Sequence, residues 1–181
     1  MLPVTVDAHI SAPREQIYDL VVDLALRPAW CGSWLSDYRL ANPRAQGKGA
    51  AARYRLDAPG NTQYVETSIV EVERPRLIVE ATHGGRNGKT LGEVVWELSR
   101  AGNNLTRVQL TVQSEPGTPR ERVKEALGTR RWTRRRAKAA LERLRVIFEE
   151  HRDGPLPRAT VAGFEPLKAL RFGASSRPVR S

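Results

Sequence analysis

The sequence predicts an α+β fold in which a seven-stranded antiparallel sheet curls around one long C-terminal helix. Most of residues 3–113 alternate between apolar and polar side chains in short runs, separated by turns rich in Gly, Pro and Asn. Residues 118–150 instead carry apolar side chains at helical spacing, interrupted by a single glycine. An antiparallel sheet with one apolar face needs a cover, and this helix is the only predicted element long enough to provide it.

The first strand is predicted over residues 3–11, because Val4, Val6, Ala8 and Ile10 alternate with polar neighbours. A short helix is expected next, since Pro13 stands near its first position and an acidic residue follows in its first turn. A second short helical segment is expected to end near residues 28–30. Two short helices therefore separate the first strand from the rest of the sheet.

The other six strands are predicted over residues 37–41, 49–57, 62–73, 77–83, 90–99 and 106–113. Within strand 77–83, alternation places His83 on the same face as Leu77 and Val79, and Glu80 on the opposite face. Because Leu77 and Val79 are apolar, we expect their face to point into the protein. His83 would then lie near the rim of any cavity inside the sheet.

The predicted helix over residues 118–150 has small side chains in the middle of its apolar face. Thr133, Ala137 and Ala140 lie there, and larger apolar residues return only near the end of the helix. At about 100° per residue, Arg130 lies about 20° from Ala137, and Trp132 lies on the far side. A helix that is thin in its middle and packs against a curled sheet leaves a cavity, so we expect a pocket at this face.

The length of 181 residues fits one domain over residues 1–150, followed by a basic, proline-rich tail over residues 151–181 that we expect to be disordered. No apolar stretch is long enough to span a membrane, and no secretion signal is visible. The single cysteine excludes an internal disulfide. These features favour a cytoplasmic location.

The positive charge is concentrated at the C-terminal end. Residues 1–117 are neutral overall, so the net charge of +10 belongs to residues 118–181. One interpretation is a surface for an anionic partner such as RNA, the ribosome or a membrane. The other is a solvated helix face followed by a charged tail, and the sequence leaves both open.

Two segments carry a resemblance to a known family. Residues 6–23 read VDAHISAPREQIYDLVVD and are followed by Pro28-Ala29-Trp30, and residues 72–77 form a strand–proline–strand turn that reads VERPRL. Over about residues 3–150 the chain resembles the START/Bet v 1-like superfamily, in particular its SRPBCC group of polyketide cyclases, dehydrases and lipid-transport proteins. The resemblance implies a helix-grip fold with a hydrophobic cavity between the long helix and the sheet. Members of the family bind lipids, sterols, quinones, plant hormones or polyketides, and some cyclise or dehydrate polyketides.

Arg130 is the candidate polar anchor of the expected cavity. A guanidinium group that faces an apolar cavity must be paired or must reach water. Arg130 could bind a carboxylate, phenolate or enolate oxygen of a ligand, or extend to the cavity mouth. It could instead pair with Glu66, whose alternation with Val70 and Val72 points it inward unless a β-bulge turns it outward.

The other candidate site residues have less specific roles. A histidine can act as a general acid or base or simply lie at the rim, and a tyrosine can donate to a ligand carbonyl or form part of the wall. The three histidines and the one cysteine show no metal-ligand spacing, so we expect no metal and no cofactor. The remaining candidates are His83, Tyr54, Tyr64, Trp96, Thr133 and Ala137.

Three functions are compatible with the sequence. The first is a cytoplasmic binding protein for a small apolar ligand with at least one anionic or carbonyl oxygen, anchored by Arg130. The second is a polyketide cyclase, aromatase or dehydratase in which Arg130, His83 and a tyrosine steer an enolate and a proton. The third is an interaction protein that uses the basic helix and tail.

Overall fold

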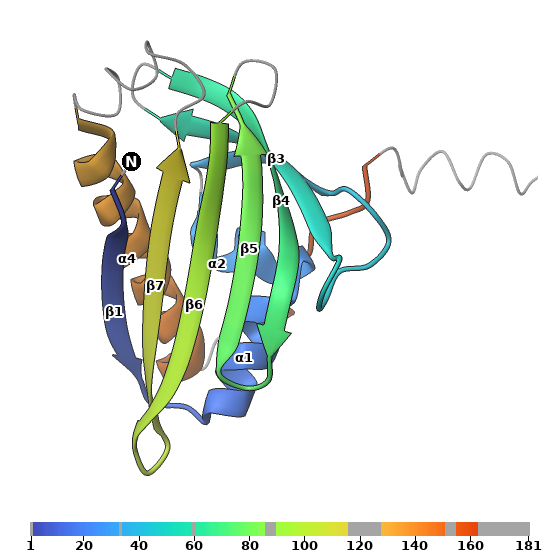
Figure 1. The fold of residues 1–181 in the computed structure, drawn as a ribbon. Helices are drawn as coiled ribbons and strands as arrows, with labels where there is room; N and C mark the ends of the chain where they lie inside the picture. Colours follow the sequence, from blue (N-terminus) through green and yellow to red (C-terminus); the bar gives the residue numbers. More distant parts are fainter. Residues whose placement is uncertain are drawn as a thin grey trace, which may run out of the picture.

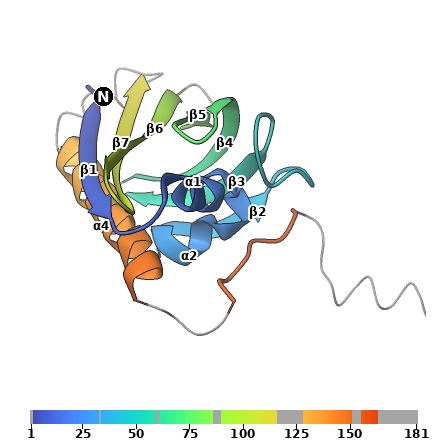
Figure 2. The same cartoon turned by 90° about the horizontal axis from the view of Figure 1, so that it is seen from below.

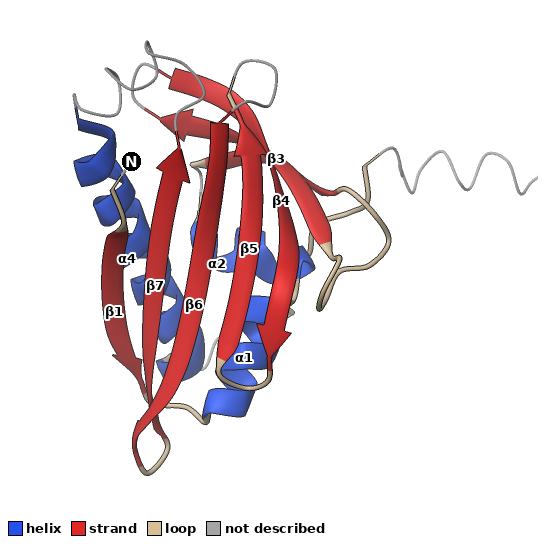
Figure 3. Cartoon of the chain, viewed as in Figure 1, coloured by secondary structure: helices blue, strands red, loops and turns tan. Residues whose placement is uncertain are grey.

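The computed structural model describes residues 2–32, 34–58, 61–85, 90–115, 128–150 and 155–162. Seven strands form one antiparallel sheet in the order β1-β7-β6-β5-β4-β3-β2. The strands are β1 (Val4–Ile10), β2 (Leu35–Leu40), β3 (Ala51–Ala58), β4 (Asn61–Glu73), β5 (Leu77–Gly84), β6 (Thr90–Gly102) and β7 (Leu105–Glu115). The sheet curls, and the helices lie on its concave side (Figures 1 and 3). The predicted α+β helix-grip fold is therefore confirmed.

Two short helices follow β1, as predicted. The described helices are α1 (Arg14–Val22), α2 (Arg27–Cys31) and α4 (Arg130–Glu149), with a 3₁₀ turn η1 (Leu24–Leu26) between α1 and α2. Asp23 caps that turn, because its carboxylate accepts a hydrogen bond from the backbone N–H of Ala25 at 2.9 Å. Figure 2, viewed along the strands, shows the sheet as an open arc whose gap is closed by α2 and α4.

The last helix begins later than predicted. Gly128 has a φ of 127°, which lies outside the right-handed region, and α4 begins two residues later at Arg130. The helix predicted over residues 118–150 therefore does not pass unbroken through Gly128, and its part before residue 128 lies outside the described residues. Ala137, Leu141 and Leu144 of α4 are buried, and the helix packs against β1 and α2. Among the described helices, none is long and apolar enough to cross a membrane.

The face of strand β5 that points into the core is the opposite of the predicted one. Ile78 and Glu80 are 0% and 1% exposed, whereas His83 is exposed. The prediction is wrong because it assigns the charged residue to solvent. Glu80 is buried because Arg27 lies beside it and compensates its charge, a partner that comes from a distant part of the sequence.

Strand β4 contains a β-bulge. Its register with β5 shifts at Val70, which is 40% exposed. The bulge reverses the faces of the strand on either side of it, so Glu66 points outward. Its carboxylate lies 2.9 Å from the guanidinium of Arg53 on the outer face of the sheet. The alternative pairing of Glu66 with Arg130 is therefore not formed.

Residues 155–162, which belong to the predicted tail, run along the edge strand β2. The Leu40 N–H donates to the Thr160 carbonyl at 2.9 Å, and the Ala162 N–H donates to the Leu40 carbonyl at 2.8 Å. Arg158 Nη2 lies 2.9 Å from Oδ2 of the buried Asp23. This part of the predicted tail is packed against the domain and satisfies backbone groups at an otherwise open sheet edge. Residues 151–154 and 163–181 lie outside the described residues.

Candidate functional site

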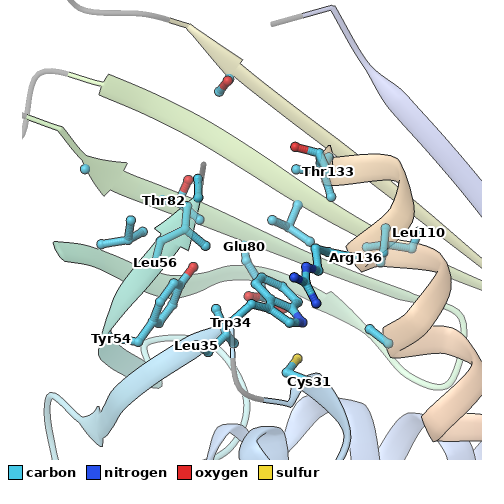
Figure 4. Close-up of a pocket in the computed structure, with 18 of the residues that line it drawn as sticks. Cys31, Trp34, Leu35, Tyr54, Leu56, Glu80, Thr82, Leu110, Thr133 and Arg136 are labelled. Carbon is cyan, nitrogen blue, oxygen red and sulfur yellow. The ribbon is translucent and has the colours of Figure 1, made fainter. Parts of the chain in front are cut away.

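A pocket lies between the concave face of the sheet, α2 and the first half of α4 (Figure 4). Its volume is about 200 Å³. Most of the side chains that line it are apolar or aromatic, and they come from α2, from β2 to β7 and from α4. They include Arg27, Trp30, Cys31, Trp34, Leu35, Tyr54, Leu56, Val65, Glu80, Thr82, Val94, Trp96, Leu110, Trp132, Thr133, Arg136, Ala137 and Ala140.

An ion pair lies at the buried end of this pocket. Arg27 Nη2 and Nη1 donate to Glu80 Oε1 and Oε2 at 2.7 Å and 3.2 Å. Thr67 Oγ1 donates to the same carboxylate at 3.0 Å, and Trp96 Nε1 donates to it at 2.9 Å. Each Glu80 oxygen therefore accepts two hydrogen bonds, which occupies the roughly four lone-pair sites of a carboxylate. Both charged side chains are almost completely buried.

Aromatic rings enclose the Arg27 guanidinium. Its central carbon lies 4.9 Å from the ring centroid of Trp30 and 5.6 Å from that of Trp96, within the range of cation–π attraction. Burial by itself lowers the pKa of Arg27, but the Glu80 carboxylate overrides this effect, so the pKa is raised above its usual range. The Arg27 guanidinium therefore remains charged at neutral pH.

Two stacked tyrosines and a thiol lie near this pair. The rings of Tyr38 and Tyr54 are 5.7 Å apart and nearly parallel. Burial raises the pKa of both hydroxyl groups well above their usual range. Burial also raises the pKa of the Cys31 thiol to about 12. All three groups are therefore protonated at neutral pH.

The helix side of the pocket carries a second arginine. Figure 4 shows Arg136 projecting from α4 toward the middle of the pocket. Its guanidinium carbon lies 5.8 Å from the ring centroid of Trp132, which makes an edge contact with Trp34 at 6.0 Å between centroids. Arg136 forms no ion pair with any other residue that the structure describes. The pocket therefore contains one positive charge that the described side chains do not neutralise.

Tyr54, Trp96, Thr133 and Ala137, predicted as site residues, line the pocket together. The hydroxyl-bearing Tyr54 stands on the β3 side, opposite Thr133 on α4 (Figure 4). Trp96 is 2% exposed and takes part in the Glu80 network. Whether any of these side chains contacts a ligand stays a prediction.

Four other predicted site residues lie away from the pocket. Arg130 and His83 are exposed, and Tyr64 is 60% exposed on the outer face of the sheet. Glu66 is paired with Arg53 on that outer face. The structure therefore does not bring these four side chains together with the pocket-lining residues.

Arg130 and Trp132 exchange the roles that helical geometry predicts for them. The face of α4 that lines the pocket contains Trp132, Arg136 and Ala140, at four-residue spacing, together with Thr133 and Ala137. Arg130 lies two turns before Ala137, where it is exposed and outside the described pocket lining. The prediction that Trp132 lies on the far side is wrong, because Trp132 lines the pocket together with Ala137.

Sequence reasoning missed Arg27, Glu80 and Arg136. The first two left a signal, since each is a lone charge within an apolar segment, LALRPAWC at residues 24–31 and LIVEAT at residues 77–82. Two such charges of opposite sign predict a buried pair. Arg136 left none, because it is one of six basic residues within residues 130–138. Among the described residues, no group of three His, Cys, Asp or Glu side chains is placed to hold a metal ion.

Comparisons with known proteins agree with this fold and indicate a family. The sequence profile of the family described as polyketide cyclase / dehydrase and lipid transport matches residues 1–149. No curated protein matches the chain. A START superfamily protein from Mycobacterium smegmatis is 15% identical with a TM-score of 0.58, covering 83% of this chain and 99% of its own. A protein from Thermus thermophilus is 20% identical with a TM-score of 0.59, covering 79% and 94%. A conserved protein from Geobacillus kaustophilus is 13% identical with a TM-score of 0.62, covering 81% and 95%.

Proposed function

Because the chain belongs to the polyketide cyclase / dehydrase and lipid transport family, we propose that it binds a small, largely apolar ligand in the pocket between α4 and the sheet. The resemblance inferred from its opening residues is thereby confirmed. The observation that carries the proposal is an apolar pocket containing a cation, Arg136, with no ion-pair partner among the described residues. A ligand with an apolar body and one anionic or carbonyl oxygen complements both features.

The pocket volume limits the size of this ligand. A dry apolar cavity of about 150 Å³ is large enough to hold benzene. The pocket here has about 200 Å³. It therefore suits one or two fused rings, or an equivalent length of alkyl chain, with any longer part extending out of the pocket. Bicyclic aromatic acids and ketones are the first ligands to test.

The titratable side chains in the described lining favour binding over turnover. A cyclase, aromatase or dehydratase, the alternative function, needs a group that exchanges protons near neutral pH. The pKa values of Cys31, about 12, and of Tyr54, well above its usual range, are too high. Both oxygens of Glu80 are occupied by hydrogen bonds. His83, the predicted acid–base candidate, is exposed and lies outside the described lining.

A cytoplasmic location is part of the proposal. The only cysteine, Cys31, is free and buried, so no disulfide supports the fold. A reducing compartment suits a protein of this kind. Native mass spectrometry of the protein purified from a cytosolic fraction is expected to reveal a bound small molecule that denaturation releases.

Calorimetric titration with two probes tests the role of Arg136. The probes are 2-naphthoate, which is anionic, and 2-acetylnaphthalene, a neutral ketone of similar shape. A hydrogen bond to a charged group contributes about 1.5–3 kcal/mol, so Arg136→Gln is expected to weaken naphthoate binding roughly 10- to 100-fold. The ketone should be affected less, because it loses no ion pair.

Arg135→Gln is the matched control, because Arg135 is the neighbouring residue on α4 and is exposed. It removes the same charge from the same turn without changing the pocket lining. All four tryptophans line the pocket, so near-ultraviolet circular dichroism reports whether a probe binds there. Unchanged naphthoate affinity in Arg136→Gln would refute the anchor role. Failure of both probes to bind the wild-type protein, with no co-purified ligand, would refute the proposed function.

A further inference from the structure

We propose that the protein docks on membranes containing anionic lipids through a basic surface beside the pocket opening. This surface, the basic helix surface, consists of Arg130, Arg131, Arg134, Arg135 and Lys138 on α4. The proposal goes beyond ligand binding, because these side chains lie outside the described pocket lining. Its test is therefore independent of whether a ligand is found.

The basic helix surface concentrates positive charge that no acidic side chain among the described residues pairs with. Its five side chains are exposed, and none forms an ion pair with another described residue. Residues 130–138 contain six basic residues and no acidic one. They also occupy the N-terminal half of α4, where the helix dipole is positive and favours negative charge. The positive side chains repel one another, and contact with an external anionic surface would reduce this repulsion.

The basic helix surface lies at the end of the molecule where the pocket opens. The buried end of the pocket contains Trp30 and Glu80, which are 0% and 1% exposed. Its outer end is lined by the last residues of β3, β5 and β7, the first residues of β6, and the start of α4. Figure 1 shows the first turns of α4 at the same end of the molecule as the ends of β5 and β7. The first turns of α4, which carry most of the basic helix surface, therefore lie at the end of the molecule where the pocket opens.

Exposed apolar side chains gather at this same end. Leu2, Tyr64 and Leu91 are 72%, 60% and 49% exposed. Leu91 begins β6 and lines the outer end of the pocket. Leu2 precedes β1, whose residue Val4 pairs with Val112 near the end of β7. Exposed leucine and tyrosine side chains at the same end of a protein as a cluster of arginines are features that favour binding at the interface of an anionic bilayer.

A nucleic acid would use this surface differently. Single-stranded nucleic acids bind by stacking bases on exposed aromatic rings as well as by phosphate contacts. Among the described residues at this end, the large exposed apolar side chains are Leu2, Leu91 and the single ring of Tyr64. The apolar side chains have a role at a lipid interface and none in phosphate binding. The combination of charge and apolar exposure therefore favours the membrane.

Vesicle sedimentation with the full chain tests the proposal. Vesicles of phosphatidylcholine alone are compared with vesicles of an equal mixture of phosphatidylcholine and phosphatidylglycerol. We expect binding to the mixed vesicles, weakening as salt is raised, and little binding to the neutral ones. The combined variant Arg131→Gln, Arg134→Gln and Arg135→Gln should lower the partition coefficient about 100-fold, given what a basic residue contributes near an anionic bilayer. Leu91→Glu should lower it roughly tenfold, because it removes apolar insertion and adds a negative charge.

The control variant removes the same charge from the opposite end of the sheet. It combines Arg74→Gln, Arg76→Gln and Arg100→Gln, whose side chains are exposed near the β4–β5 and β6–β7 turns. Thermal midpoints establish that all variants are folded. Equal losses in the two triple variants, equal binding to neutral vesicles, or a preference for single-stranded RNA over the mixed vesicles would each overturn the proposal.

Discussion

Arg27 and Glu80 form a buried ion pair, and replacing either one alone is expected to destabilise the protein strongly. The loss of unfolding free energy in a single variant should be close to, or larger than, the loss in the double variant. Arg27→Leu leaves the Glu80 carboxylate, whose side chain is 1% exposed, without its counter-ion. Glu80→Leu leaves the Arg27 guanidinium buried in the same way. Breaking a buried ion pair from one side costs about 3–5 kcal/mol, because the remaining charge is desolvated and uncompensated.

The double variant removes both charges together. In the wild type, Thr67 Oγ1 and Trp96 Nε1 donate hydrogen bonds to Glu80, and in the double variant both donors lose this acceptor. A buried donor without a partner costs about 1–3 kcal/mol. Independent effects would sum to about 6–10 kcal/mol, whereas the double variant should lose only about 2–6 kcal/mol. At the middle of these two ranges, the coupling between the two positions is about 4 kcal/mol.

Urea unfolding followed by far-ultraviolet circular dichroism measures these free energies without relying on the tryptophans next to the pair. For a chain of this size, 1 kcal/mol corresponds to about 2–4 °C in Tm, so each single variant should unfold roughly 10 °C lower than the wild type. Single variants that lose less than about 1 kcal/mol, or losses that add within about 0.5 kcal/mol, would refute the account of a buried, mutually dependent pair.

Three further predictions concern the rest of the structure. Arg158→Ala should lower the free energy of unfolding by roughly 1.5–3 kcal/mol, because it removes a charged hydrogen bond to the buried Asp23. Arg53→Ala breaks an exposed ion pair and should change the free energy of unfolding by at most about 1 kcal/mol. Equal effects of the two variants in urea unfolding would contradict this prediction. The Cys31 thiol should resist a soluble thiol reagent at pH 8 and react once urea unfolds the protein, and rapid labelling of the folded protein would argue against its burial. Because its pKa is raised from 9.0 to about 12 in the folded state, the stability contributed by the neutral thiol is fully present below about pH 9 and is lost as the pH rises through 12. The decline in unfolding free energy measured across that range should be shallower in Cys31→Ala.

The sequence alone predicts the architecture because the fold depends on periodicity. Alternation defines the strands, and the buried residues Val4, Val6 and Ile10 of β1 lie on the face that the pattern predicts. The same holds for β6, where Trp96 and Leu98 are buried. Local patterns of this kind involve neighbouring residues only. They are therefore readable without knowing which strands pair.

The face of a strand is less predictable when a distant residue decides it. In β5, Glu80 is buried because Arg27 reaches it from α2, and His83 points outward as a consequence. In β4, the bulge at Val70 turns Glu66 outward, and nothing in the local sequence marks its position. The error in β5 arises because alternation fixes which residues share a face, but not which face points into the protein. The error in β4 arises because the bulge interrupts the alternation itself.

The sequence by itself determined the helix-grip fold, the order of its elements and the presence of a cavity beside a helix with small side chains. Only the tertiary structure decided that Arg136 enters this cavity and that Arg130 remains outside. Both residues belong to one basic run on α4, and an arginine has the same helical propensity whichever side it faces. The difference comes from where the helix lies relative to β1 and α2, which is fixed by contacts between residues far apart in the chain.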